Sequence, residues 1–441
     1  MHAWSGERAK ARLTGREPGL EPATPRLPGN AEKAVSLLQN PERTAYLLKI
    51  SGIPTARGAR PEPGTRTYRI HMFENRVLML EKSRQPTQWL REAWGEPSFE
   101  QIDPADDDYE ASAVIRLARR ALYAAGLHYG HLVLHAASPH RVKVHAVSAD
   151  WLLQHQGRLR TAAETWWAEE QGRWSGSPIM LGADPEFALR HPDGHMVLAS
   201  DFMGTNGVVG CDSTRYREEL ALHQHPLVEL RPAPSANPDL LFLRIVKALR
   251  TAAKKIDNPS IEWVSGGMPF EGYPIGGHIH FSGIRPDYQL LRQLDAYLAL
   301  PLVLIEDAGC RMRRPRYGYL GDMREKDYGG TPGFEYRTLP SWLVDPIVTR
   351  GVLHLARLIA DSSHHLMINE LSPGLVRAYY RGEQERIKPL VTAMWEELRQ
   401  LPGYARSGAV LDRYFARLLS GNVWPADRDL RIVWSHYSGK R

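Results

Sequence analysis

The sequence has little of what would place the chain in a membrane or an oxidising compartment. Two cysteines, Cys211 and Cys310, are too few among 441 residues for a disulfide framework or a cysteine-ligated metal site. The longest apolar run, residues 296–305, is about half as long as a bilayer requires. The basic, Pro/Gly-rich N-terminus lacks the apolar core of a signal peptide. We therefore predict a cytoplasmic protein that does not associate with membranes.

The sequence also lacks a strong concentration of one charge. The formal charge is +6, from 56 Lys and Arg against 50 Asp and Glu, which only mildly favours anionic ligands. Basic and acidic residues are mostly interleaved, which argues against nucleic-acid binding, because nucleic-acid binders gather positive charge on one surface. The one dense basic cluster is "RMRRPRYGYLGDMREK", residues 311–326. Taken alone, such a cluster predicts a solvated surface loop.

The length of the chain predicts two or three domains. We predict a disordered tail (1–30), a small α/β domain (31–150), a helical linker (151–176), a second, mixed domain (177–372) and a helical extension (373–441). The tail lacks hydrophobic periodicity. The small domain combines an amphipathic helix with two hairpins, "YRIHMFENRVLMLEK" and "HLVLHAASPHRVKVHAV". In the second domain, helices that begin with a capping residue and proline alternate with strands.

Four predicted strands of the second domain each carry two polar residues at positions i and i+2. The pairs are Asp184 and Glu186, Glu229 and Arg231, His278 and His280, and Glu335 and Arg337. Residues i and i+2 of a strand point to the same face. The residues around them are largely apolar and suit a buried opposite face. The pattern predicts one sheet face that carries four carboxylates, two histidines and two arginines.

Any one of these pairs is more often a solvated sheet face or a satisfied ion pair than a site. Four pairs in one domain indicate more, because clustered carboxylates repel each other unless cations hold them together. Hard oxygen ligands favour Mg²⁺ or Mn²⁺, and arginine forks suit phosphoryl groups. The face therefore predicts divalent metal ions that bridge phosphate oxygens. Cupins and amidohydrolases also use an HxH motif, but this chain lacks the further ligands that they require.

Six stretches in order resemble the phage-type carboxylate–amine ligases (COOH·NH2 ligases, or amidoligases) of the glutamine synthetase / glutamate–cysteine ligase superfamily. They are "LGADPEF", "GCDS", "PLVELRPAPS", "GGMPFEGYPIGGHIHFSG", "RRPRYGYLGD" and "GFEYRTLPSWL", within residues 178–372. The resemblance implies an α+β fold, a glutamine synthetase-like curved antiparallel sheet with flanking helices, whose concave face binds ATP and metal ions. The preceding small domain faintly resembles a degenerate ATP-grasp remnant.

The resemblance also implies roles for individual residues. It implies metal ligands at Asp184, Glu186, Glu229 and Glu335, catalytic contacts from His278, His280 and Arg337, and a cofactor contact from Arg231. Asp184 departs from the better-known relatives, which carry glutamate at that position. The basic cluster lies between the histidine strand and the Glu-x-Arg strand, so a mobile loop with Arg313, Arg314 and Arg316 becomes a candidate to bind ATP phosphates or an acidic substrate. Asp212 is a further candidate contact.

The implied reaction is amide formation. Phosphoryl transfer from ATP turns a carboxylate into an acyl phosphate, which an amine then attacks; His280 is a candidate proton acceptor because imidazole titrates near neutrality. The expected substrates are a small-molecule or peptide carboxylate and an amine, and the oligomeric state is left open. Two alternatives remain at this stage: a metal-dependent hydrolase that uses His278 and His280, and a binding protein that kept the fold without the chemistry.

Overall fold

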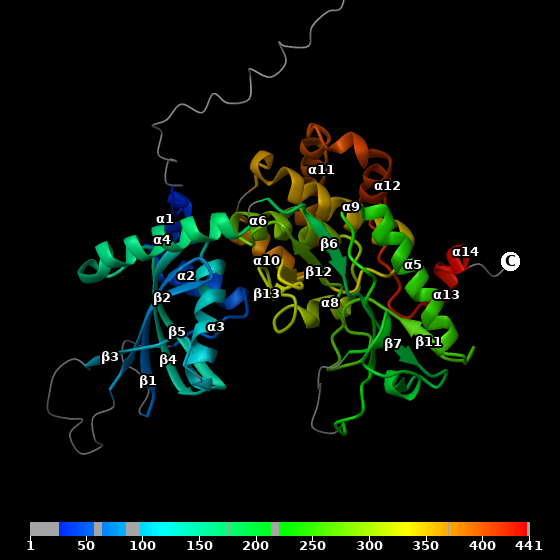
Figure 1. Ribbon diagram of the computed structural model, residues 1–441, viewed down its shortest axis with the longest axis horizontal. Coiled ribbons are helices and arrows are strands. Elements are labelled where there is room, and N and C mark those ends of the chain that lie inside the picture. The colour runs from blue at the N-terminus through cyan, green and yellow to red at the C-terminus, as the bar shows by residue number, and fades with distance from the viewer. Residues whose placement is uncertain are drawn as a thin grey trace, which may run out of the picture.

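The computed structural model describes residues 26–56, 64–84, 98–106, 108–174, 176–212, 220–368 and 370–438 (Figure 1). Most of the predicted tail lies outside the described residues. The described end of the tail is anchored at Asn30, whose side-chain amide donates hydrogen bonds of 2.9 Å to the carbonyls of Tyr129 and Ala149. The Asn30 side-chain oxygen accepts a hydrogen bond of 2.7 Å from the amide of His128.

The first region of the chain is built on a five-stranded sheet in the order β3-β2-β1-β4-β5 (Figure 1). The strands are β1 (Arg66–Phe73), β2 (Arg76–Ser83), β3 (Phe99–Ile102), β4 (Tyr129–Ser138) and β5 (Arg141–Ser148). The two predicted hairpins are present as β1–β2 and β4–β5. Neighbouring strands all pair antiparallel, so this region is α+β, and the predicted α/β label is wrong. The turns inside the hairpins are too short for the crossovers that parallel strands need.

Helices cover both faces of this sheet. They are α1 (Glu32–Leu38), α2 (Pro41–Ile50), α3 (Tyr109–Ala124) and α4 (Gln156–Trp174). Asp108 caps α3 by accepting hydrogen bonds from the amides of Glu110 and Ala111. On the opposite face, Trp167 of α4 contacts Phe73 edge-to-face, with ring centroids 5.4 Å apart. The predicted linker therefore contains a helix that is packed onto the first region.

The second region contains two antiparallel sheets, ordered β13-β14-β12-β6 and β11-β7-β10-β9, with β8 on β7. The strands are β6 (Met180–Ala183), β7 (Glu186–Arg190), β8 (Met196–Val197), β9 (Val209–Cys211), β10 (Leu227–Leu230), β11 (Glu262–Val264), β12 (Ile279–Ser282), β13 (Met323–Asp327) and β14 (Pro332–Tyr336). Backbone hydrogen bonds from Asp184 to His278 and from Glu186 to Gly276 join the two sheets. The predicted α+β fold with a curved antiparallel sheet is confirmed, with a break at residues 184–185.

Helices surround these sheets. They are α5 (Pro238–Lys255), α6 (Tyr288–Gln293), α7 (Leu300–Leu302), α8 (Ala308–Arg313), α9 (Pro346–Ser362), α10 (Pro373–Arg381), α11 (Gln384–Arg399), α12 (Gly408–Leu419), α13 (Leu430–Val433) and α14 (Ser435–Ser438). As predicted, α5 and α9 begin with a side-chain cap, Asn237 and Asp345, followed by proline. Among the described residues, none of the helices combines the length and apolar character needed to span a bilayer.

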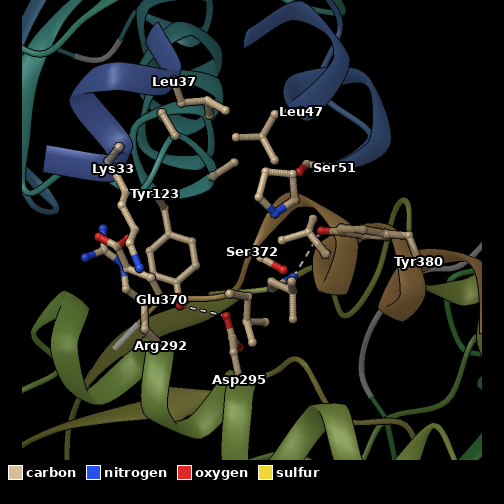
Figure 2. Close-up of a pocket in the computed structure, with 18 residues that line it drawn as sticks. Lys33, Leu37, Leu47, Ser51, Tyr123, Arg292, Asp295, Glu370, Ser372 and Tyr380 are labelled. Carbon is tan, nitrogen blue, oxygen red and sulfur yellow. Dashed lines mark hydrogen bonds between the residues drawn. The ribbon is translucent and has the colours of Figure 1, made fainter. Parts of the chain in front are cut away.

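A buried carboxylate connects the two regions. Tyr123 of α3 donates a hydrogen bond of 2.6 Å to one oxygen of Asp295 (Figure 2), and Tyr336 of β14 donates one of 2.7 Å to the other oxygen. Burial raises the pKa of Asp295 to about 7. A Cβ on Gly321 would lie 2.4 Å from the Tyr123 ring, so the segment before β13 packs directly on α3. These contacts fix α3 against the part of the second region that leads into β13 and β14.

Candidate functional site

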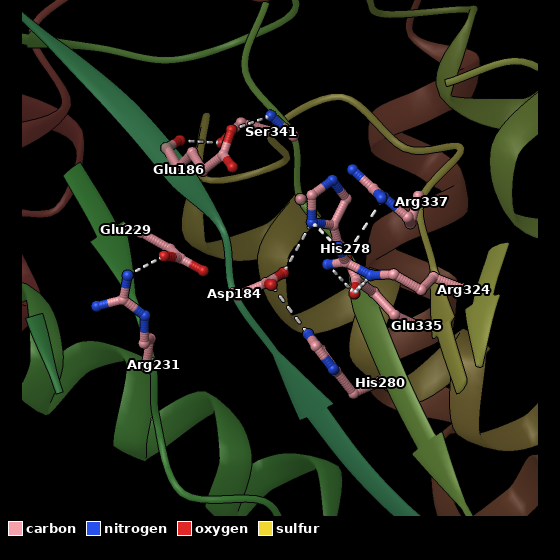
Figure 3. A network of polar contacts seen from close by, with 12 residues as sticks. Asp184, Glu186, Glu229, Arg231, His278, His280, Arg324, Glu335, Arg337 and Ser341 are labelled. Atoms are coloured by element: carbon pink, nitrogen blue, oxygen red, sulfur yellow. Dashed lines mark hydrogen bonds and ion pairs between the residues drawn. The ribbon is translucent and has the colours of Figure 1, made fainter. Parts of the chain in front are cut away.

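The candidate site lies where the two sheets of the second region meet. Pro185 has no amide hydrogen to donate, so the ladder of β6 ends at Ala183 and β7 begins at Glu186. The carboxylate of Asp184 points toward the two histidines, whereas Glu186 accepts a hydrogen bond of 2.7 Å from the amide of Gly276 (Figure 3). The predicted Asp184–Glu186 pair therefore flanks a strand break.

Asp184, His278 and Glu335 form a group that could hold a metal ion. One oxygen of Asp184 and one of Glu335 each lie 3.2 Å from Nδ1 of His278, and the three ligand atoms lie within 4.8 Å of one another. Both oxygens are buried and accept no hydrogen bond from the described residues. Buried carboxylate oxygens normally have a partner. Two such oxygens beside an imidazole nitrogen therefore fit a divalent cation as the missing partner.

A second pair of acids lies beside this group. Glu186 of β7 and Glu229 of β10 are directly opposite each other in the sheet register. Like charges in that position destabilise a sheet. Burial, together with neighbouring carboxylates, raises the pKa of Glu186 well above its usual range and that of Glu229 to about 8. Arg231 donates a hydrogen bond to Glu229, and it is also bonded to the carbonyls of Thr205 and Cys211.

His280 contacts the other oxygen of Asp184. Its Nε2 lies 3.0 Å from that oxygen, and its Nδ1 lies 2.5 Å from the hydroxyl of Tyr328. Burial lowers the pKa of His280, but the charge of Asp184, the hydrogen bond to Asp184 and the charge of Glu335 together raise that pKa above the ordinary value. Conversely, burial would raise the pKa of Asp184, and the two histidines hold it well below its usual range. His280 therefore carries positive charge more readily than a free histidine.

Glu335 is surrounded by cations that the i and i+2 pattern did not single out. Arg324 of β13 lies opposite Glu335 in the register and donates two hydrogen bonds, of 3.0 and 2.6 Å, to one of its oxygens. Lys326 lies 3.6 Å from the same oxygen, and Arg337 lies 3.3 Å from the other. Burial would raise the pKa of Glu335, but His278 and the arginines lower it. Glu335 therefore stays ionised within its positive surroundings.

The three arginines of the predicted mobile loop lie in three different surroundings. The segment is helix α8 followed by a turn. Arg313 is buried, donates to the carbonyls of Thr338 and Arg337, and lines the site. Arg314 is buried away from the site, paired with Glu306. Arg316 is exposed and lines none of the cavities described below. Successive residues of a helical turn point in different directions, which a loop interpretation does not anticipate.

The site residues line two connected cavities. A central cavity of about 120 Å³ is lined by all four predicted metal-binding acids together with His278, Arg313 and Arg337. It shares Asp184, Glu229 and the candidate contact Asp212 with a larger cavity of about 760 Å³, which His280 and Arg231 also line. The structure thus brings nine of the eleven residues proposed from the sequence to these two cavities, and Asp212 with them. Arg314 and Arg316 lie outside both cavities.

The part of the chain that holds this site matches a known family. Residues 181–436, more than half of the chain, match the family described as phage phiEco32-like COOH·NH2 ligase type 2. The chain belongs to this family. This is a family of carboxylate–amine ligases by its description, and the resemblance seen in the sequence is confirmed. The match includes the C-terminal helices but not the first region. A search of curated proteins gave no match for the ligase.

Similarities between the ligase and solved structures are distant. A bifunctional glutathione synthetase from Pasteurella multocida matches at 12% identity over 55% of the ligase and 48% of that chain, with a TM-score of 0.37. A novel glutamine synthase homolog matches at 15% identity over 61% and 72%, with a TM-score of 0.29. The complex of the prokaryotic ubiquitin-like protein Pup with its ligase PafA gives 12% identity over 56% and 65%, with a TM-score of 0.34. The ligase thus spans about half the length of the glutathione synthetase, and TM-scores this low do not establish a common fold on their own.

Proposed function

We propose that the chain is an ATP-dependent ligase that activates a substrate carboxylate as an acyl phosphate and joins it to an amine. The observation that carries this proposal is the pair of unbonded, buried oxygens of Asp184 and Glu335 around His278, beside arginines and a large cavity. Acids alone would suit many metal sites. Acids that face arginines suit a metal ion that brings a phosphate with it.

In this proposal, Asp184, His278 and Glu335 hold the divalent ion. Their two carboxylate oxygens favour Mg²⁺ or Mn²⁺, and the imidazole nitrogen favours Mn²⁺ of the two. Glu186 and Glu229 line the same cavity and become ligands if a cation lowers their raised pKa values. The ion would neutralise phosphate charge and orient the transfer.

The cationic side chains would serve the phosphoryl group. When bound, ATP supplies that group to the substrate carboxylate, ADP leaves, and the amine then displaces phosphate. Arg337 and Arg324 are already held beside Glu335, so little reorganisation is needed for them to stabilise negative charge. His280, with its raised pKa, suits contact with a phosphate oxygen better than the proton-acceptor role considered from the sequence. A cytoplasmic location, where ATP is abundant, fits this proposal.

The direct test is calorimetric titration of ATP with and without Mg²⁺. We expect wild type to bind ATP only with Mg²⁺, and Glu335→Gln to weaken that binding on the order of 100-fold, as loss of a metal-site group does. Glu262→Gln is the matched control, because Glu262 lies in the same region, is paired with Arg190 and lines neither cavity. Absence of Mg²⁺-dependent ATP binding by folded wild type would contradict the proposal. If wild type does bind Mg²⁺–ATP, hydroxylamine trapping with candidate acids would identify the activated carboxylate.

A further inference from the structure

A third cavity joins the first region to the candidate site. Its volume is about 550 Å³, and it lies between α3 on one side and residues 319–325 on the other. It shares Asp322, Arg324 and Arg337 with the central cavity, and Arg324 also lines the 760 Å³ cavity. We call this third cavity the interregion cleft. Through these shared residues, a ligand in the cleft would reach Arg337, next to Glu335.

The interregion cleft is strongly basic. Its lining includes five arginines, Arg116, Arg119, Arg120, Arg324 and Arg337, against two acids, Asp322 and Glu325. The three arginines of α3 make no ion pair with a described residue. Arg116 is exposed, and among the described residues its side chain has no recorded hydrogen bond. A cleft with excess positive charge of this kind suits an anionic ligand.

The wall of the cleft is already in place. Arg120 stacks over the ring of Tyr319, 3.9 Å from its centroid, and donates a hydrogen bond of 3.2 Å to the carbonyl of Ser51. Arg119 donates to the carbonyl of Asn75 at 3.0 Å. The hydrogen bond from Tyr123 to Asp295 fixes the C-terminal end of α3 (Figure 2). Binding would therefore cost little ordering of Arg119 and Arg120.

We propose that the interregion cleft binds the carboxylate substrate of the ligase, and that the arginines of α3 select an acidic amino acid or peptide, which carries carboxylates besides the one that reacts. The proposal rests on the proposed ligase function and adds the substrate class to it. The reacting carboxylate would lie near Arg337 and the additional carboxylates near Arg116 and Arg119. Because the family match begins at residue 181, α3 would supply a selectivity that the matched region does not itself contain.

The test is calorimetric titration of the tripeptides Glu-Glu-Glu and Gln-Gln-Gln into the full chain, with and without a non-hydrolysable Mg²⁺–ATP analogue. We expect Glu-Glu-Glu to bind and Gln-Gln-Gln not to bind. The affinity for Glu-Glu-Glu should fall as salt is added. Arg116→Ala should weaken its affinity about tenfold, the value of one charge-assisted contact, whereas Arg116→Lys should retain most of it. Arg141→Ala is the matched control, an exposed arginine of the same region that does not line the cleft.

Equal binding of both peptides, no binding of the acidic peptide at millimolar concentration, or an unchanged affinity in Arg116→Ala would overturn the proposal. The nucleotide analogue is titrated separately into each variant. Loss of peptide binding with intact nucleotide binding would confirm the role of Arg116. If wild type fails to bind the nucleotide, the ligase proposal fails, and the peptide titrations without nucleotide still decide whether the cleft recognises acidic ligands.

Discussion

Two sheets of this chain carry buried histidines in opposite electrostatic surroundings. In the first region, His71 of β1 and His131 of β4 are register partners, and their rings stack with centroids 4.7 Å apart. Burial, with the neighbouring histidines and arginines, lowers the pKa of His71 to about 3. In the second region, burial would also lower the pKa of His280, but Asp184 raises it. The same residue type on the same kind of strand is neutral in one sheet and favours its charged form in the other.

The difference shows what distinguishes a site from a buried polar cluster. Neither ring nitrogen of His71 has a hydrogen-bond partner among the described residues. The ring of His155 contacts that of His71 edge-to-face, and an oxygen of Glu81 lies 4.0 Å from Nε2 of His155. In the second region, two carboxylates approach His278 to 3.2 Å, and each has an unbonded oxygen there. Convergence of acids on a histidine, and not the histidine itself, indicates cation binding.

The largest expected effect tests whether only the second region binds a metal ion. We expect Asp184→Asn to weaken Mn²⁺ binding on the order of 100-fold, because it removes one of the two charged oxygens beside His278. Glu81→Gln, which changes the carboxylate beside His155, should leave Mn²⁺ affinity unchanged. Electron paramagnetic resonance of free Mn²⁺ measures both. Equal losses in the two variants would show that the first region also holds a cation.

A second expected effect is a pH dependence that comes from Glu229. Its pKa rises from 4.5 to about 8 on folding, so its contribution to stability is full below about pH 4.5 and is lost as the pH rises toward 8. Without divalent ions, the melting temperature of wild type should therefore fall across that range, and the fall should be smaller in Glu229→Gln. Mg²⁺ should stabilise wild type more at pH 8 than at pH 6, because a ligand must lose its proton.

Calorimetric melting at several pH values, with and without Mg²⁺, measures these differences. Glu325→Gln is a suitable control for the charge change, since Glu325 lies on β13 outside the central cavity. Identical pH profiles for wild type and Glu229→Gln would show that Glu229 keeps an ordinary pKa, and the pairing of Glu186 with Glu229 would then need a fixed cation.

Much of the site could be predicted because a strand places residues i and i+2 on one face. The same rule, applied to "MREKD", would also have found Arg324 and Lys326, which face Glu335 from β13. Which strands pair cannot be read from the sequence, so the placement of Glu186 opposite Glu229 emerged only from the structure. Spacing also fails in a helical turn, where Arg313 and Arg314 point to different surroundings.

Contacts between segments that are distant in the sequence could not be predicted from local sequence patterns. Tyr123 and Asp295 are separated by 172 positions, and no local periodicity connects them. The hairpins and capped helices were predictable because each is set by neighbouring residues. The cleft between α3 and residues 319–325 depends instead on how two regions pack, so the sequence of α3 alone does not place its arginines in a cleft.

The smallest expected effect concerns His71, and it tests whether this buried histidine of the first region lacks a partner. The buried ring nitrogens of His71 have no hydrogen-bond partner among the described residues. Because an unpaired buried polar group destabilises a fold, His71→Leu should stabilise the fold by about 1 kcal/mol. The pKa of His71 is about 3 in the folded chain, below its ordinary 6.5. The unfolded chain therefore binds a proton at this ring more readily, and the free energy of unfolding falls as the pH drops below 6.5. The gain in His71→Leu should therefore be larger at pH 5 than at pH 8.

Denaturant unfolding of wild type and His71→Leu at the two pH values measures this gain. His278→Leu provides the contrast, since it should abolish Mn²⁺ binding whatever its effect on stability. A loss of several kcal/mol in His71→Leu, equal at both pH values, would mean that the His71 ring has a partner that the described residues do not include. The histidines of the two sheets would then differ in the ligand that each binds, and not in whether they bind one.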